Sequence, residues 1–173
     1  MKSTINSVTS SLDRVLEPLG SVSEIFRKTG EKLFIEGLTG SSRALFLTQL
    51  SELVRKPLLV ISPDQNTAET LLGDSKYFSH LTKLKVSPLF FPSWELIPYE
   101  SLSPLRETSG ERLNVLDQLR SSSQLIVIAP IEAVLNYVMP RTILEKNSFT
   151  IQKGDNLDRQ ILETCLNGSG YTR

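Results

Sequence analysis

The residues best suited to chemistry lie in a glycine-containing turn between an apolar segment, "KLFIE", and an apolar helical segment. The turn contains Gly37, Thr39, Gly40, Ser41, Ser42 and Arg43. A strand, a glycine turn and then a helix is the order found in loops that bind phosphate through backbone N–H groups at a helix N-terminus. This order of elements therefore suggests a nucleotide-binding site.

The turn lacks the side chains that nucleotide hydrolysis requires. A working phosphate loop has a lysine that reaches the terminal phosphates and a Ser or Thr hydroxyl that binds magnesium. Here Arg43 keeps the charge in a different geometry, and Ala44 has no oxygen. The sequence predicts no hydrolysis and favours a structural turn, with anion binding at the helix N-terminus as the open alternative.

No other metal or catalytic site is predicted. Asp64 is the only acid that follows a buried strand, and it is better placed to cap the helix that starts there. His80 is expected at a helix end, and Cys165 is expected to be buried on the apolar face of the last helix. We expect no catalytic residue, metal or cofactor in this chain.

Composition narrows the class of protein. The 173 residues contain 19 Lys and Arg against 19 Asp and Glu, so no overall field attracts nucleic acid or membrane. One cysteine allows no internal disulfide, and no apolar run reaches the roughly 20 residues of a membrane span. The polar N-terminus is not a signal peptide, so we expect a cytoplasmic protein without membrane contact.

Short apolar strands alternate with helices along most of the chain. Strands are predicted over 32–37, 57–62, 86–92 and 124–130, and helices over 42–54, 63–80, 108–119 and 131–140. Continuous apolar runs such as "PLLVIS" are typical of strands buried on both faces. The predicted fold is α/β, a three-layer parallel sheet with helices on both faces.

The chain is expected to contain three parts. Residues 1–30 are predicted as a helical extension, 31–141 as the α/β domain, and 142–173 as the beginning of a small, truncated α+β domain. In that last part we expect a strand over 147–154, a helix over 157–166 and a further strand starting near Tyr171.

The stretch "FFPSWELIPYESLSPLRETSGERLNVLDQL" resembles the N-terminal region of bacterial transcription-repair coupling factors. The residues that carry the family motif are Trp94, Glu95, Pro98, Tyr99, Glu100, Ser103, Pro104 and Arg112. The resemblance extends over "LIVIAPIEAVL" and the closing "GDNLDRQILETCLNGSGYTR".

The resemblance implies a module similar to the excision-repair protein UvrB, a helicase-type α/β domain of the phosphate-loop class with an inserted second domain. In coupling factors this copy of the phosphate loop is degenerate, and a separate translocase module hydrolyses ATP. The implied role is a non-catalytic module that recruits UvrA through its second domain and helps to inhibit the parent protein. Most of the residues that contact UvrA are expected in the part of the second domain that this chain lacks, so the UvrA site is expected to be incomplete here. RNA polymerase and DNA would be bound by parent domains outside this chain.

Two other function classes remain open at this point. One is an ATP-dependent UvrB-type helicase or DNA-binding subunit, which an intact loop and an aromatic hairpin would support. The other is a stand-alone α/β adaptor.

Some side chains have two interpretations. The loop of Trp94, Pro98 and Tyr99 is expected to fold over the strand ends, with an exposed binding surface as the alternative. The arginines of the helical stretch after this loop are expected to pair with neighbouring acids on a solvated face, with phosphate contact as the alternative. These residues are Arg106, Arg112 and Arg120, with Glu107 and Glu111 as the acids. Arg159 and Arg173 are candidates for a partner surface.

Overall fold

The computed structural model describes residues 32–94, 105–156, 158–168 and 171. Contacts between backbone segments divide the chain into two compact units, Met1–Asn136 and Tyr137–Arg173. The predicted extension over 1–30, most of the motif loop and Arg173 lie outside the described residues. The domain boundaries predicted from the sequence stay predictions.

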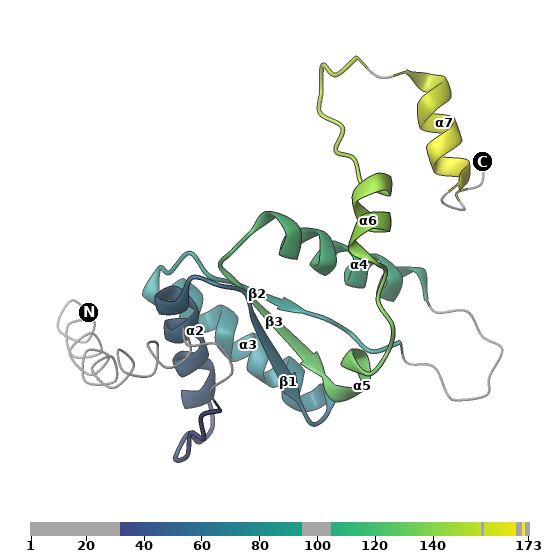
Figure 1. Ribbon diagram of the computed structural model, residues 1–173. Coiled ribbons are helices and arrows are strands. Elements are labelled where there is room, and N and C mark those ends of the chain that lie inside the picture. Colours follow the sequence, from purple (N-terminus) through teal and green to yellow (C-terminus); the bar gives the residue numbers. More distant parts are fainter. Residues whose placement is uncertain (1–31, 95–104, 157, 169–170, 172–173) are drawn as a thin grey trace, which may run out of the picture. The chain divides into compact units, whose positions relative to one another are not determined.

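Unit 1 is built on a parallel sheet (Figure 1). Its strands are β1 (Leu58–Ser62), β2 (Ser87–Phe90) and β3 (Leu125–Pro130), in the order β1-β3-β2. Val127 of β3 lies opposite Leu59 on one side and Leu89 on the other. Every residue of β3 is buried because a central strand of a parallel sheet is covered on both faces.

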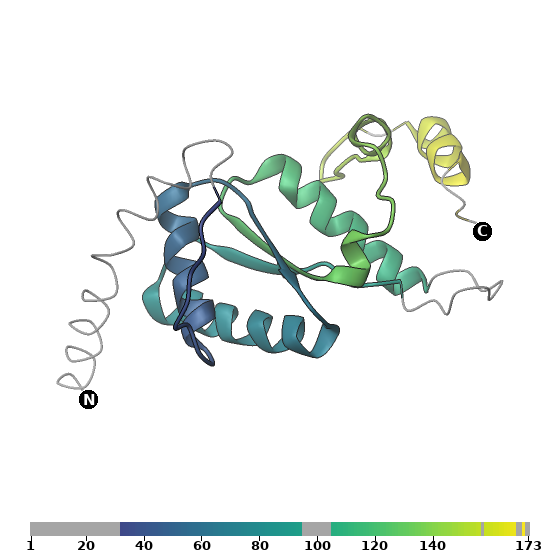
Figure 2. The ribbon, with the colours of Figure 1, turned by 60° about the horizontal axis from the view of Figure 1, so that its bottom comes forward.

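Helices cover the two faces of this sheet, as predicted (Figure 2). Helices α2 (Ser42–Val54) and α3 (Gln65–Thr82) lie on one face, and α4 (Arg106–Ser121) lies on the other. The first core cluster is Ala68, Val86, Ile126 and Ile128, with Leu47 and Leu71 packed against it. The second is Phe91, Val115, Val127, Ala129 and Ala133, with Leu116 and Leu119 packed against it. The α/β class with three layers is confirmed.

The sequence signals for helix ends are also confirmed. Asp64 caps α3, since its Oδ1 accepts a hydrogen bond of 2.7 Å from the backbone N–H of Thr67. His80 lies in the last turn of α3, and Lys83 ends that helix in a left-handed conformation with φ of 55°.

Two predictions about strands in unit 1 are wrong. Residues 32–37 form no regular secondary structure, and Phe34 is 89% exposed. A strand needs a neighbour for its backbone hydrogen bonds, and no described strand lies beside this segment. The second error concerns β1, which lies at a sheet edge and is exposed at Leu59 and Ile61 rather than buried on both faces.

The elements from α5 onward differ more from the predictions. The helix predicted over 131–140 ends early, as α5 (Ile131–Val134), and α6 (Arg141–Asn147) was not predicted. An ion pair of 2.7 Å between Arg141 and Glu145, four residues apart, supports α6, whose N-cap residue is Pro140.

In unit 2 the predicted last helix is confirmed as α7 (Arg159–Gly168). The strand predicted over 147–154 is wrong, because the described part of unit 2 contains no strand with which it could pair. Cys165 is exposed and not buried, since α7 buries none of its residues. None of the described helices is long and apolar enough to cross a membrane.

Candidate functional site

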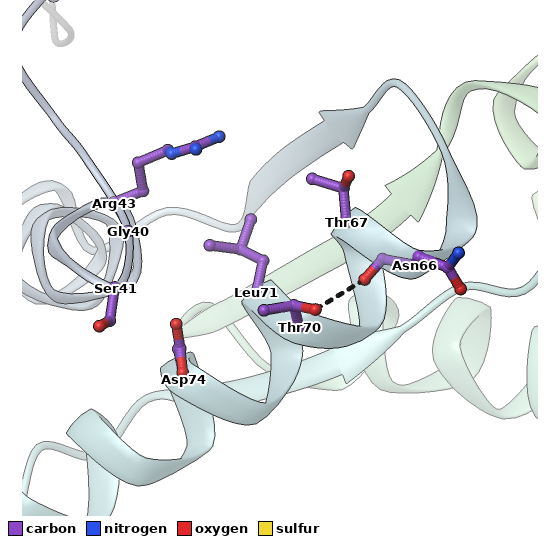
Figure 3. Close-up of a pocket in the computed structure, with 8 residues that line it drawn as sticks. All are labelled: Gly40, Ser41, Arg43, Asn66, Thr67, Thr70, Leu71 and Asp74. Carbon is purple, nitrogen blue, oxygen red and sulfur yellow. Dashed lines mark hydrogen bonds between the residues drawn. The ribbon is translucent and has the colours of Figure 1, made fainter.

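A cleft of about 540 Å³ lies between the start of α2 and the first half of α3 (Figure 3). The glycine turn and both helices contribute residues to its lining. From the glycine turn and α2 these are Gly40, Ser41 and Arg43; from α3 they are Asn66, Thr67, Thr70, Leu71 and Asp74. The predicted degenerate phosphate loop therefore borders a real cleft, the place where a nucleotide would be sought.

The glycine turn leads directly into α2. Gly37 and Gly40 have positive φ angles of 83° and 54°, which favour glycine. The backbone N–H of Ser42 donates to the Thr39 carbonyl at 3.2 Å, and the Ser42 hydroxyl donates to the same oxygen at 2.6 Å. Both donors of Ser42 are therefore used within the turn, where a phosphate loop would direct its N–H groups toward a ligand.

The side chains after the turn do not supply nucleotide chemistry. Ala44 is fully buried, so the position that carries the magnesium hydroxyl in a working loop belongs to the core here. Arg43 is exposed and is the only cation among the described residues that line the cleft, and Asp74 adds a carboxylate on the α3 side (Figure 3). An anion in this cleft would meet one positive and one negative side chain, which is a poor environment for a triphosphate.

Asp64 is engaged elsewhere. The Thr67 backbone N–H, with the Thr67 hydroxyl, holds the pKa of the Asp64 carboxyl below its usual value. Both Asp64 carboxylate oxygens therefore accept hydrogen bonds from Thr67 at the N-terminus of α3. No group of three or more His, Cys, Asp or Glu side chains in the described part of the chain could hold a metal ion.

Two described residues of the family motif, Trp94 and Arg112, are in contact, and Arg112 is buried. This side chain is 2% exposed, and its guanidinium carbon lies 4.0 Å from the ring centroid of Phe91 and 4.3 Å from that of Trp94. It donates to the carbonyl of Pro92 at 2.5 Å and to that of Ala133 at 3.4 Å. Burial lowers the pKa of Arg112, which still stays charged at neutral pH. Arg112 thus ties α4 to the chain segments that follow β2 and β3.

The prediction of a solvated face for Arg112 is wrong. Its burial could have been predicted from its spacing from Val115, Leu116 and Leu119, because this spacing puts all four residues on one side of a helix. Arg120 is indeed on the surface, but it pairs with Asp117 at 2.9 Å rather than with Glu107 or Glu111.

The structure brings together only some of the predicted site residues. Trp94 and Arg112 are in contact, and the other motif-loop residues lie outside the described ranges; these are Glu95, Pro98, Tyr99, Glu100, Ser103 and Pro104. Arg159, a candidate for the partner surface, is exposed on α7 and pairs with Glu163 at 2.9 Å.

Known proteins similar to this chain fall into two groups. The transcription-repair-coupling factor of Escherichia coli is 28% identical over 144 residues, covering 83% of this chain and 12% of its own length. That of Haemophilus influenzae is 31% identical over 74% of this chain and 11% of its own length. The UvrABC system protein B of Thermosipho africanus is 26% identical over 79% of this chain and 22% of its own length. No protein-family model matches the chain.

These two similarities decide the family. The chain is homologous to the UvrB-like region of transcription-repair-coupling factors. It spans only about an eighth of the coupling factors that it matches (12% for the Escherichia coli protein).

Proposed function

We propose that this chain is a non-catalytic module of a transcription-repair coupling factor. It would link stalled RNA polymerase to nucleotide excision repair by recruiting UvrA, and it would help to inhibit the parent protein. The observation that carries the proposal is the cleft beside Gly40, which lacks the side chains of a working phosphate loop. The lysine is replaced by Arg43, the magnesium ligand by the buried Ala44, and the Ser42 donors stay within the turn.

Nucleotide binding tests the non-catalytic part of the proposal. We would titrate the purified chain with a fluorescent ATP analogue, with and without magnesium, into the millimolar range. We expect no saturable signal, and an intact UvrB protein assayed in parallel should give one. Saturable, magnesium-dependent binding would contradict the proposal and favour the alternative, an ATP-dependent UvrB-type subunit.

UvrA recruitment needs its own measurement. We would immobilise the chain and measure binding of UvrA from the same organism by interferometry, after circular dichroism has verified that the chain is folded. We expect binding that is weaker than that of the full-length coupling factor, because the UvrA site is incomplete in this chain, and that does not depend on nucleotide at the cleft near Arg43. A folded chain that shows no binding would contradict recruitment by this part of the protein.

Inhibition of the parent protein can be measured separately. Removing these residues from a full-length coupling factor should raise its basal ATPase rate, because an inhibitory contact would be lost. An unchanged basal rate would remove inhibition from the proposal and leave recruitment untouched.

A further inference from the structure

Basic side chains gather at the edge of the sheet where β1, β2 and β3 begin. Arg55 and Lys56 lie between α2 and β1. Lys83 and Lys85 lie between α3 and β2. The strands are parallel, so their first residues meet at one edge, together with the ends of the helices that precede them (Figure 2). The topology therefore brings two basic pairs, distant in the sequence, to the same edge.

Two exposed serines lie between these basic pairs. β3 is the middle strand of the described sheet, and Ser122 and Ser123 precede it. Gln124 fixes their place, because its carbonyl accepts from the backbone N–H of Ser87 at 3.1 Å and its side-chain amide donates to Glu52 of α2 at 3.0 Å. Adjacent strands lie about 4.8 Å apart, so β1 and β2 are separated by roughly 10 Å. We call this set the basic row; its members are Arg55, Lys56, Ser122, Ser123, Lys83 and Lys85.

Helix capping explains only part of this charge. Cations are favoured at the C-terminal turn of a helix because its dipole is negative there, which accounts for Arg55 and Lys83. These two residues end α2 and α3 in the left-handed conformation, with φ of 52° and 55°, where glycine is favoured. Lys56 and Lys85 lie beyond the helix ends, where the effect of the dipole has fallen off. The basic row therefore carries more positive charge than the helix ends require.

The nearby acids do not neutralise the basic row. In the closing turns of α2, α3 and α4 the acids are Glu52, which accepts from Gln124, and Asp117, which pairs with Arg120 at 2.9 Å. All four cations of the row are exposed, and none forms an ion pair with a described residue. Lys and Arg are almost never fully buried unless they are paired. These cations therefore face water or an anion, whatever other domains the parent protein carries.

The chemistry of the row suits the phosphates of a nucleic acid. Basic side chains and serine hydroxyls are among the groups that contact phosphate oxygens in protein–DNA complexes. Each strand of duplex DNA carries one phosphate per roughly 3.4 Å of helix axis, so a row of roughly 10 Å would meet about three phosphates.

We propose that the basic row binds the phosphate backbone of duplex DNA without reading its sequence. The contact uses no residue of the cleft beside Gly40 and needs no nucleotide. With about three phosphates neutralised, the logarithm of the association constant should fall against the logarithm of salt concentration with a slope of about −2.7. We expect a Kd on the order of 10⁻⁴ M at about 150 mM salt, and about twentyfold tighter binding at about 50 mM salt.

Fluorescence anisotropy with a short labelled duplex of mixed sequence, over a series of salt concentrations, tests this proposal. Lys56→Gln combined with Lys85→Gln removes one cation from each side of the row. We expect this variant to lower the magnitude of the salt slope by about 2 and the affinity at about 50 mM salt at least tenfold. Lys76→Gln combined with Arg106→Gln is the matched control, since both side chains are exposed, lie outside the row and carry the same total charge. The control should keep the slope of the parent chain, and circular dichroism should show both variants folded.

Three results would overturn the proposal. One is a folded parent chain that binds no duplex at about 50 mM salt and about 0.5 mM protein. Another is an equal loss in the row variant and the control, which would assign the binding to overall charge. The third is binding of poly-glutamate without binding of the duplex, which would assign the row to an acidic protein partner.

A photo-crosslinker maps the contact without removing a cation. In a Cys165→Ser background, a crosslinker attached at Ser123→Cys, in the middle of the row, should capture the duplex. The same crosslinker at Glu111→Cys, an exposed position of α4, should capture none, although this substitution removes an acid and so favours DNA. Equal capture at both positions, or capture only at position 111, would place the DNA elsewhere and overturn the proposal.

Discussion

The guanidinium of Arg112 lies over the ring of Phe91, with 4.0 Å between the guanidinium carbon and the ring centroid. Trp94 lies at 4.3 Å, so the charge is held among aromatic faces and backbone carbonyls without a described acidic partner. Aromatic faces attract a desolvated cation through their quadrupole, and the carbonyls satisfy its N–H groups. This arrangement stabilises the packing of α4 against the sheet, and it gives Trp94 and Arg112 a structural role.

Replacing Arg112 by leucine should therefore destabilise unit 1. We expect the free energy of unfolding to fall by about 2–4 kcal/mol, because the carbonyls of Pro92 and Ala133 would lose their buried donor. Urea unfolding followed by circular dichroism measures the change. The control is Arg106→Leu on the same helix, where the side chain is exposed and the change should stay within about 0.5 kcal/mol. Equal losses in both variants would contradict a special role for Arg112.

Asp64 should make the stability of the chain dependent on acid pH. Its folded-state pKa is lowered by the Thr67 N–H, so its stabilisation is complete above the ordinary aspartate pKa of about 3.9. The stabilisation is lost as the pH falls through the lower folded-state value. Asp64→Ala should lower the melting temperature at pH 7, and the difference from the parent chain should shrink below about pH 4.

Asp64→Asn separates the cap from the charge. Asparagine keeps an acceptor oxygen for Thr67 and does not ionise, so most of the stability should remain while the acid dependence weakens. Thermal melts of the parent chain and both variants between about pH 3 and pH 7 supply the comparison. An Asn variant with the full acid dependence of the parent chain would assign that dependence to other carboxyls.

Restoring the missing hydroxyl of the phosphate loop should harm the fold rather than create a nucleotide site. Ala44 is fully buried, and its carbonyl already accepts from Thr48 at 2.8 Å. Ala44→Thr adds a methyl and a hydroxyl to a filled position, and we expect a loss of about 1–3 kcal/mol without magnesium-dependent ATP binding. Ser42→Thr, at an exposed position of the same turn, should be nearly neutral. Tight ATP binding by the Ala44→Thr variant would show that one hydroxyl was all the cleft lacked.

The sequence predicted the parts of the fold that depend on local patterns. The apolar runs of β2 and β3, the helix α2 and the Asp64 cap follow from residues close together in the chain. The failed strand over 32–37 shows the limit, because its apolar residues meet the local pattern while pairing requires a distant neighbour. The prediction that β1 is buried on both faces fails for the same reason, since burial depends on which helix lies across the strand.

The candidate site was predictable in part. The missing lysine and hydroxyl could be read directly from the turn, but the cleft depends on how α2 packs against α3. The charge of Arg112 predicts a position on a solvated face, whereas its helical spacing from Val115 predicts a buried one, and the structure follows the spacing. Its burial requires two aromatic rings and two carbonyls from other segments, which no local pattern reveals.

Arg159 offers a direct test of the proposed partner surface. Its side chain is 79% exposed on α7 and is held by Glu163, four residues along the helix. If α7 contributes to UvrA recruitment, Arg159→Glu should weaken UvrA binding about tenfold, because a charge reversal at an interface repels a complementary partner. Arg141→Glu is a closely matched control, since Arg141 is 77% exposed and makes the same i,i+4 pair on α6. Interferometry with both variants separates the outcomes: a selective effect at Arg159 places UvrA on α7, whereas equal effects indicate only nonspecific electrostatic attraction.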